Sequence, residues 1–208
     1  MRTRVYIDGF NLYYGCLKGT AHKWLNLHAL CTALLPKNQI EVVRYFSAQV
    51  SARPNDPDQP TRQQTYFRAL GTVPQVRIHL GHFLTHEVAM PEAAAWRAGK
   101  HRPVQVMKTE EKGSDVNLAT YLLMDAFDDA FDMAVIVSND SDLKEPISLV
   151  RTRFHKGIGI LNPQAKVSRA LQPLAHFIKP IRTGALANAQ FPDAMVDATG
   201  AFQKPARW

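Results

Sequence analysis

The chain carries the sequence MAVIVSNDSD at residues 133–142, where five apolar residues run directly into a polar loop with two aspartates. A short, continuous apolar run bounded by turn residues is typical of a strand that is buried on both faces. Residues 4–8 (RVYID) repeat the arrangement, with a short strand that stops at an aspartate. Two such strands predict a parallel sheet that is covered by helices on both sides.

Further strands and helices alternate along the chain as far as residue 180. More strands are predicted at residues 40–47, 75–80, 155–161 and 177–180, and helices at residues 27–35, 61–70, 114–126, 143–153 and 168–175. Ser114 is the expected N-cap of its helix. Residues 81–112 have no sustained period and are predicted to form a hairpin or an excursion loop. The alternation predicts an α/β domain over residues 1–182, followed by a loosely attached or extended tail at residues 183–208.

The composition is that of an ordinary globular protein with a basic balance. The 208 residues carry a formal net charge of +7, and 46% of them are hydrophobic. No apolar run is long enough to cross a bilayer, and Asp8 comes too early for a secretory signal peptide, so we expect a cytoplasmic protein. The excess of Lys and Arg favours polyanionic partners such as nucleic acid. Cys16 and Cys31 have no metal-ligand spacing and are predicted to be reduced thiols.

Four aspartates are predicted to meet at one edge of the sheet. Asp8, Asp140 and Asp142 follow strands, and Asp115 opens the helix before the second of these strands. In an open parallel sheet, ligands bind outside the carboxyl ends of the strands, where the strand order reverses. Carboxylates gathered there raise one another's pKa, and a hard cation such as Mg²⁺ or Mn²⁺ resolves the conflict. Such a site suits phosphoryl transfer, because the metal activates water and neutralises phosphate.

Each acidic feature also has a purely structural explanation when it is taken alone. Asp8 and Gly9 could form a plain turn, and Asp115 could simply favour the positive end of its helix dipole. Residues 138–142 could be a loop that caps the next helix. All three features fall at strand ends or at a helix start, which favours a catalytic metal site.

Three motifs resemble those of the NYN domain family, a branch of the PIN-like nucleases. They are YIDGFNL at residues 6–12, EKGSDVNLA at residues 111–119 and VSNDSDL at residues 137–143. The resemblance implies a PIN-like three-layer α/β/α fold with a central parallel sheet of about five strands. It also implies a metal-dependent endonuclease that hydrolyses single-stranded or looped RNA with Mg²⁺ or Mn²⁺.

The position of each residue within these motifs implies its role in this chain. The four aspartates match the family's acidic metal residues, and Asn11 matches a polar partner that could orient a water or a phosphate oxygen. Ser138 matches the hydroxyl residue that lines the family's acidic pocket. Ser138, Asn139, Lys112 and Lys108 are candidates for binding substrate, the lysines through its phosphates. Asn139 stands where the family often has glycine. Because Asn tolerates unusual backbone angles, the turn is expected to survive.

Other residues have two explanations that the sequence does not separate. Arg53 and Arg62 flank a proline-rich loop, where they either bind phosphate or are solvated cations. Tyr13, Tyr14 and Trp24 either stack on bases or belong to the core and its rim.

A zinc site at His79, His82 and His86 is disfavoured, because positions 79 and 82 face opposite ways on a strand and no cysteine or acidic residue completes the ligand set. A dinucleotide-dependent oxidoreductase is disfavoured because no strand is followed by G-x-G-x-x-G. The main alternative to the RNA endonuclease is a non-catalytic RNA-binding or regulatory module with the same fold. The intact set of aspartates favours the enzyme. The oligomeric state stays open, a homodimer included.

Overall fold

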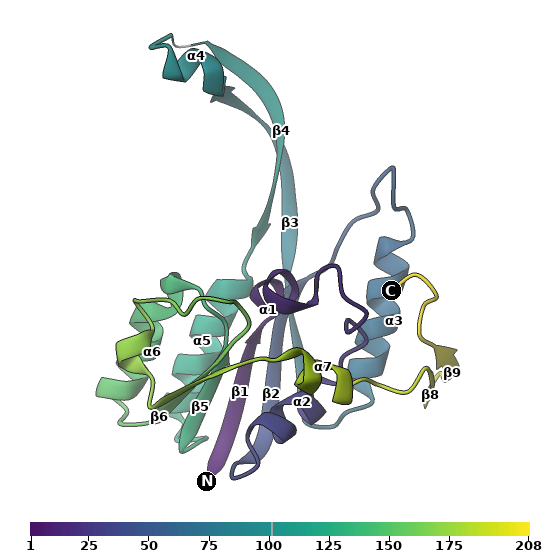
Figure 1. The fold of residues 1–208 in the computed structure, drawn as a ribbon, viewed down its shortest axis with the longest axis vertical. Coiled ribbons are helices and arrows are strands. Elements are labelled where there is room, and N and C mark those ends of the chain that lie inside the picture. The colour runs from purple at the N-terminus through teal and green to yellow at the C-terminus, as the bar shows by residue number, and fades with distance from the viewer. Residues whose placement is uncertain (101) are drawn as a thin grey trace.

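The computed structural model describes residues 1–100 and 102–208 and has a central sheet with helices on both faces (Figure 1). The sheet has seven strands in the order β4-β3-β2-β1-β5-β6-β7. Only β3 and β4 pair antiparallel; the other neighbours are parallel. This confirms the predicted three-layer α/β class. The sheet holds six parallel strands, close to the five expected, and β4 in addition.

The strands are β1 (Arg2–Asp8), β2 (Gln39–Ala48), β3 (Val76–Pro91), β4 (Pro103–Lys112), β5 (Met133–Val137), β6 (Gly157–Asn162), β7 (Phe177–Pro180), β8 (Ala194–Asp197) and β9 (Gly200–Gln203). The helices are α1 (Gly9–Leu12), α2 (Leu27–Leu34), α3 (Gln59–Gly71), α4 (Ala93–Arg97), α5 (Ser114–Phe127), α6 (Lys144–Thr152) and α7 (Thr183–Asn188). Single turns of π-helix and 3₁₀-helix lie at Tyr13–Leu17, Ser141–Leu143 and Gln172–Leu174.

One predicted helix, at residues 168–175, is reduced to the single turn Gln172–Leu174. Pro173 explains the difference, because it has no backbone N–H and disfavours helical angles at the residue before it. The helix predicted at residues 143–153 begins as a 3₁₀ turn before α6.

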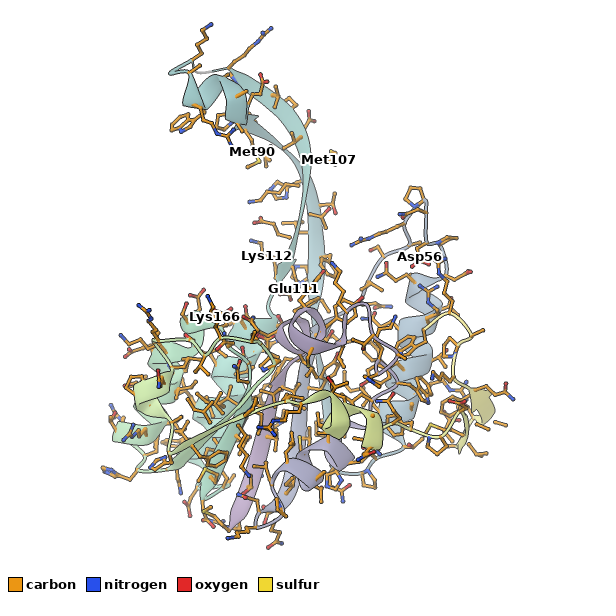
Figure 2. All side chains as sticks on the ribbon, in the orientation of Figure 1. Asp56, Met90, Met107, Glu111, Lys112 and Lys166 are labelled. Atoms are coloured by element: carbon orange, nitrogen blue, oxygen red, sulfur yellow. The ribbon has the colours of Figure 1, made fainter. Side chains whose placement is uncertain are left out.

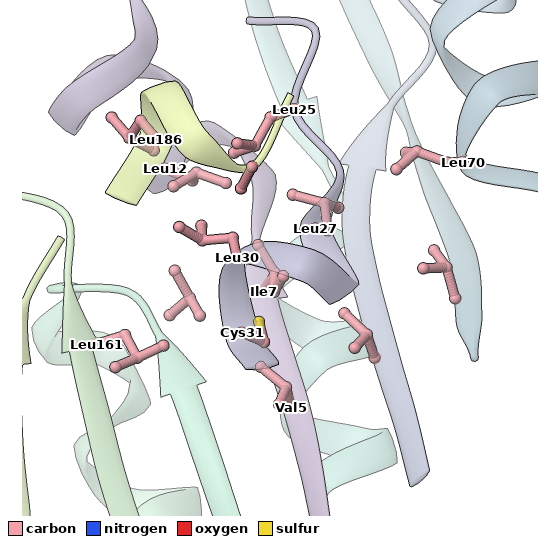
Figure 3. Packing of buried hydrophobic residues seen from close by; sticks show 14 of the residues in the cluster. Val5, Ile7, Leu12, Leu25, Leu27, Leu30, Cys31, Leu70, Leu161 and Leu186 are labelled. Atoms are coloured by element: carbon pink, nitrogen blue, oxygen red, sulfur yellow. The ribbon is translucent and has the colours of Figure 1, made fainter. Parts of the chain in front are cut away.

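The apolar run of β5 lies between two hydrophobic cores. Val135 and Val137 face the core beneath α2 and α3, whereas Ala134 and Ile136 face the core beneath α5 and α6. All five residues of β5 are buried. Figure 3 shows the first core, in which leucines of α2 pack on Val5 and Ile7 of β1, side chains that belong to the same cluster. Burial on both faces therefore explains why β5 has no polar residue.

β3 and β4 continue beyond the sheet as a long two-stranded arm that carries α4 at its far end (Figure 1). The pairing runs from His82 opposite Lys112 to Pro91 opposite Pro103, so the predicted hairpin is confirmed. Gly81 marks the point where β3 leaves the body. A Cβ there would come within 2.4 Å of the Glu111 carboxylate and 2.5 Å of the Lys112 carbonyl oxygen, so the close approach requires glycine.

Residues 183–208 pack on the body, which differs from the loose attachment expected from the sequence. Leu186, Phe191 and Phe202 are buried and belong to the same core as α2, and Leu186 appears in that core in Figure 3. The indole N–H of Trp24 donates to the carbonyl of Pro192 at 2.9 Å. These apolar residues are widely spaced in the sequence and pack at separate places on the body. No helical or strand periodicity in the segment therefore predicts that it packs there. The domain boundary at residue 182 stays a prediction.

Cys16 and Cys31 are free thiols, as predicted, and burial raises their pKa to about 11 and about 12. Within the described ranges, no helix has the length and apolar character that a membrane span needs.

Candidate active site

The candidate site lies where the strand order reverses, at the carboxyl ends of β1 and β5. A cavity of about 310 Å³ opens there, and four of its lining residues are acidic. They are Asp8 from β1, Glu111 from β4, Asp115 from α5 and Asp140 from the loop after β5. Three of the four predicted aspartates are therefore brought together, and Asn11 lines the same cavity.

Asp8 is buried and held in place by two hydrogen bonds. Its Oδ1 accepts from the Asn11 backbone N–H at 2.8 Å, and its Oδ2 accepts from the Ser138 hydroxyl at 2.9 Å. Burial raises the pKa of Asp8, and these two hydrogen bonds oppose the shift. The next residue must be glycine, because a Cβ at Gly9 would lie 2.6 Å from the Phe46 carbonyl oxygen. The Asp-Gly pair thus reflects close packing.

The loop after β5 places Asp140 beside Asp8. Ser138 is fully buried, and its Oγ accepts from the Asp140 backbone N–H at 3.1 Å while it donates to Asp8. Asp140 in turn accepts from the Asp142 N–H at 3.0 Å. Ser138 therefore fixes both acidic residues, and its hydroxyl is occupied by them.

The start of α5 is held by Glu111, a residue that was not among the predicted site residues. The carboxylate of Glu111 accepts from the backbone N–H and the hydroxyl of Ser114, at 3.0 and 2.8 Å. Gly113, and not Ser114, occupies the N-cap, because its φ of 102° is left-handed and suits glycine. Asp115 follows in the first turn. The position of Glu111 at the head of EKGSD is the signal in the sequence that could have identified it.

The cluster of negative charge is strongest at Asp115. Its pKa is raised to about 6, first by desolvation and then by the charges of Asp8, Asp140, Glu111 and Asp142. The side chain is nevertheless exposed at the cavity mouth, so solvent screens part of this effect. Asp142 is also exposed and does not line the cavity. It acts on the site through its charge.

The donor set fits a hard divalent cation with an incomplete protein shell. None of the ion pairs in the described chain involves Asp8, Asp115, Asp140 or Asp142, so their charge is uncompensated. In residues 1–100 and 102–208, no three His, Cys, Asp or Glu side chains come close enough together to hold an ion by themselves. Mg²⁺ suits this arrangement, because it commonly takes one or two carboxylates and completes its shell with waters and substrate phosphates.

The predicted substrate-binding lysines lie on the arm. Lys108 and Lys112 both pair with Glu110, at 2.7 and 3.3 Å, and neither lines the acidic cavity. Figure 2 shows Lys112 at the base of the arm, next to Glu111. Lys112 lies within the EKGSDVNLA motif, and this position in the motif suggested a role in binding substrate. The alternation of β4 instead points successive side chains to opposite faces.

Asn139 holds a neighbouring loop and does not face the cavity. Its Oδ1 accepts from the Ser168 N–H at 2.7 Å, and its Nδ2 donates to the carbonyl of Lys166 at 2.9 Å. Its backbone is not left-handed, since Asp129 and His155 are the non-glycine residues with positive φ in the described ranges. The turn survives without the unusual angles that Asn would tolerate.

A second cavity of about 370 Å³ adjoins the acidic one, and its lining includes several residues for which the sequence allowed two roles. Tyr13, Tyr14, Arg53 and Arg62 all line it. Trp24 does not, because it is fully buried in the core.

The fold and the acidic edge define a nuclease-type α/β domain. Residues 2–181 match the NYN domain, and the chain belongs to this family. The chain is 32% identical over 236 residues to 6-hydroxy-3-succinoylpyridine 3-monooxygenase HspA of Pseudomonas putida, with 100% of this chain and 75% of that protein covered. A crystal structure of a protein of unknown function from Vibrio parahaemolyticus shares the fold, with a TM-score of 0.58 at 17% identity. That match covers 88% of this chain and 93% of the Vibrio chain.

Proposed function

We propose that this protein hydrolyses phosphodiester bonds of RNA, with Mg²⁺ or Mn²⁺ held by one or two of the carboxylates of Asp8, Asp115 and Asp140 and its shell completed by waters and substrate phosphate. The observation that carries the proposal is the convergence of these carboxylates on one cavity at the switch point of the sheet, with no ion-pair partner in the described chain. A divalent ion bound there supplies charge neutralisation at the phosphate and a more acidic water.

The residues around the ion have separate tasks in this proposal. Asp8 is a fixed ligand, because both of its oxygens are oriented by hydrogen bonds. Asp115 is exposed at the mouth and is free to orient the attacking water. Asn11 accepts through its Oδ1 from the Asn139 N–H at 3.1 Å and the Gln164 amide at 3.0 Å. Its Nδ2 makes no hydrogen bond within the described part of the chain and is available to a phosphate oxygen.

RNA fits the charge around the site. The chain carries a net charge of +7, and Arg53 lies at the border of the acidic cavity and the larger one. Cations at the rim of an acidic centre bind backbone phosphates and position them for reaction. The PIN-like character of the family supports the same substrate class.

A second candidate function is oxygenation of a small ring-bearing acid. It is favoured by the relative that is named as a monooxygenase and by the aromatic lining of the larger cavity. Such a reaction would insert one oxygen atom of O₂ into the substrate and reduce the other to water, with two electrons from a reduced nicotinamide or flavin.

The test uses purified protein with end-labelled single-stranded RNA in Mn²⁺, in Mg²⁺ and in EDTA. We expect cleavage with metal, none with EDTA, and loss of cleavage in Asp140→Asn. Asp128→Asn is the control, since Asp128 is exposed and forms no ion pair in the described ranges. Equal cleavage by wild type and Asp140→Asn would identify a contaminating nuclease and overturn the proposal. RNA binding without cleavage would favour the non-catalytic module. Consumption of 6-hydroxy-3-succinoylpyridine with O₂ and reductant, without RNA cleavage, would favour the oxygenase.

A further inference from the structure

The larger cavity adjoins the acidic site. Phe10, Tyr14, Arg53 and Phe83 line both cavities, so a ligand in the larger one would contact side chains that also border the acidic cavity. Its volume of about 370 Å³ falls at the lower end of small-molecule sites. The walls come from α1 and the turn after it, from the proline-rich loop and α3, and from the end of the chain.

Aromatic rings form much of the wall. Tyr13 and Tyr14 meet edge to face with ring centroids 5.2 Å apart, and Tyr14 is 62% exposed. Tyr66 and Trp208 meet on another side at 5.3 Å. Accessible rings of this kind stack on planar ligands, and stacking on an aromatic side chain is tolerant of the identity of the ligand ring.

The charged side chains of the lining are mostly cationic. Lys23, Arg53, Arg62 and Arg207 line the cavity, against one acidic residue, Asp56. Asp56 is paired with Arg62 at 2.6 Å and has Arg207 at 4.0 Å. Burial lowers the pKa of Lys23, and the nearby charge of Arg62 lowers it further. Cations that repel one another across a cavity are relieved by an anion.

Two buried polar atoms in this wall make no hydrogen bond with the described chain. They are the indole Nε1 of Trp208 and the Oδ1 of Asp56, and the latter lies 4.0 Å from the Arg207 guanidinium. Figure 2 shows Asp56 in the loop that precedes α3, next to the start of that helix. A buried donor without a hydrogen bond is costly, so a ligand or water that accepts from the Trp208 indole N–H is expected here.

We propose that the larger cavity binds a planar aromatic ring that carries an anionic group. The ring lies against Tyr13 and Tyr14, and the anion lies near Arg53. The chemistry is shared by a nucleotide of RNA and by a small aromatic acid. An RNA nucleotide as the ligand rests on the proposed function, because this cavity would then hold the base next to the cleaved phosphate. The proposal of an aromatic ring with an anionic group does not depend on that function.

The experiment measures binding of uridine and adenosine 5′-monophosphates by calorimetry, in EDTA, so that neither metal nor cleavage contributes. The nucleosides and inorganic phosphate are the partial probes, and each should bind at least tenfold more weakly than the nucleotide. Tyr14→Ala and Arg53→Gln should each weaken nucleotide binding by about tenfold. The matched controls are Phe127→Ala, whose ring is 73% exposed, and Arg153→Gln; both residues lie outside the cavity.

A second titration with 6-hydroxy-3-succinoylpyridine separates the two sources. Nucleotide binding that depends on Tyr14 and Arg53 supports the proposal with RNA as the source. Binding of the pyridine acid alone, with the same dependence, supports it with a small aromatic acid as the source. Binding of neither, or binding that the two variants leave unchanged, overturns it. If the protein binds nucleotide but cleaves no RNA with Mn²⁺, the proposed nuclease function is overturned and the proposed ligand of the larger cavity is supported. If it cleaves RNA but binds neither probe, the nuclease function is supported and the proposed ligand is overturned.

Discussion

Asp115→Asn should stabilise the metal-free protein. Asp115 faces the charges of Asp8, Asp140, Glu111 and Asp142, and its pKa of about 6 lies above the ordinary value of 3.8. Asparagine has the same shape without the charge. The substitution therefore removes repulsion and leaves the helix start at Gly113 intact.

The size of the effect follows from the pKa. A shift from 3.8 to about 6 corresponds to about 3 kcal/mol if the whole difference were felt at neutral pH. Because the side chain is exposed at the mouth, solvent screening reduces this to roughly 1 kcal/mol. A gain of that size raises the melting temperature of a domain of this length by about 2–4 °C.

The pH dependence has a definite sign. The folded state raises the pKa of Asp115, so the ionised form is penalised in the folded protein. The penalty is complete above about pH 6, fades as the pH falls towards 3.8 and is absent below it. The difference between Asp115→Asn and wild type should therefore be largest near pH 7.5 and should shrink towards pH 4.

Thermal melts in EDTA and in Mn²⁺ test this reasoning. A cation that binds only the folded protein adds about 2.7 kcal/mol at one hundred times its dissociation constant. Mn²⁺ should stabilise wild type strongly and Asp115→Asn weakly, with Asp128→Asn behaving like wild type. If Asp115→Asn melts lower than wild type in EDTA at pH 7.5, or if Mn²⁺ stabilises both proteins equally, the repulsion that we attribute to this cavity is absent.

Three further outcomes are expected from thermal melts. Truncation after Arg182 should lower the melting temperature by about 10 °C or more, because it removes three buried apolar side chains worth about 1.5–3 kcal/mol each; a small change would mean that the tail is not docked. Replacing residues 85–109 with Asn-Gly should leave the melting temperature almost unchanged, because none of the described residues in this range belongs to either core. A large loss would give the arm a structural role. Asp125→Ala should cost about 3–5 kcal/mol at pH 7, because it leaves Arg4 and Arg44 unpaired, and equal stability would contradict the network.

The central strand of the sheet could be predicted because a strand that is buried on both faces needs an apolar side chain at each position. β5 lies between two cores, so an uninterrupted apolar run was required there, and the first polar residues after it had to mark the sheet edge. The same logic predicts from the sequence that Asp8 and Asp140 meet, and both line one cavity. Strand ends in a parallel sheet converge, and this follows from topology alone.

Other features depend on partners that are distant in the sequence. Asp125 looks like an ordinary helix residue, yet it accepts from Tyr6 at 2.7 Å and pairs with Arg4 and Arg44 from two strands. Burial raises the pKa of Asp125, but these bonds outweigh it and lower the pKa overall. No local period encodes such a network. The larger cavity escaped prediction for the same reason, since Trp208 closes it from the far end of the chain.

The two cavities should differ in how they bind phosphate, and this difference leads to a final prediction. The larger cavity is cationic, so one phosphate should bind there without metal. The acidic cavity repels phosphate until a cation neutralises its carboxylates, so a second phosphate should be accepted only with metal. Mn²⁺ should therefore raise the affinity of a 5′-phosphorylated dinucleotide about tenfold or more and leave that of a mononucleotide unchanged. Calorimetry with both ligands, with chromatography to confirm that the dinucleotide stays intact, measures the difference. Asp140→Asn should abolish the metal effect on the dinucleotide without weakening mononucleotide binding. An equal effect of Mn²⁺ on both ligands would place the metal in contact with the first phosphate and would contradict the division between the cavities.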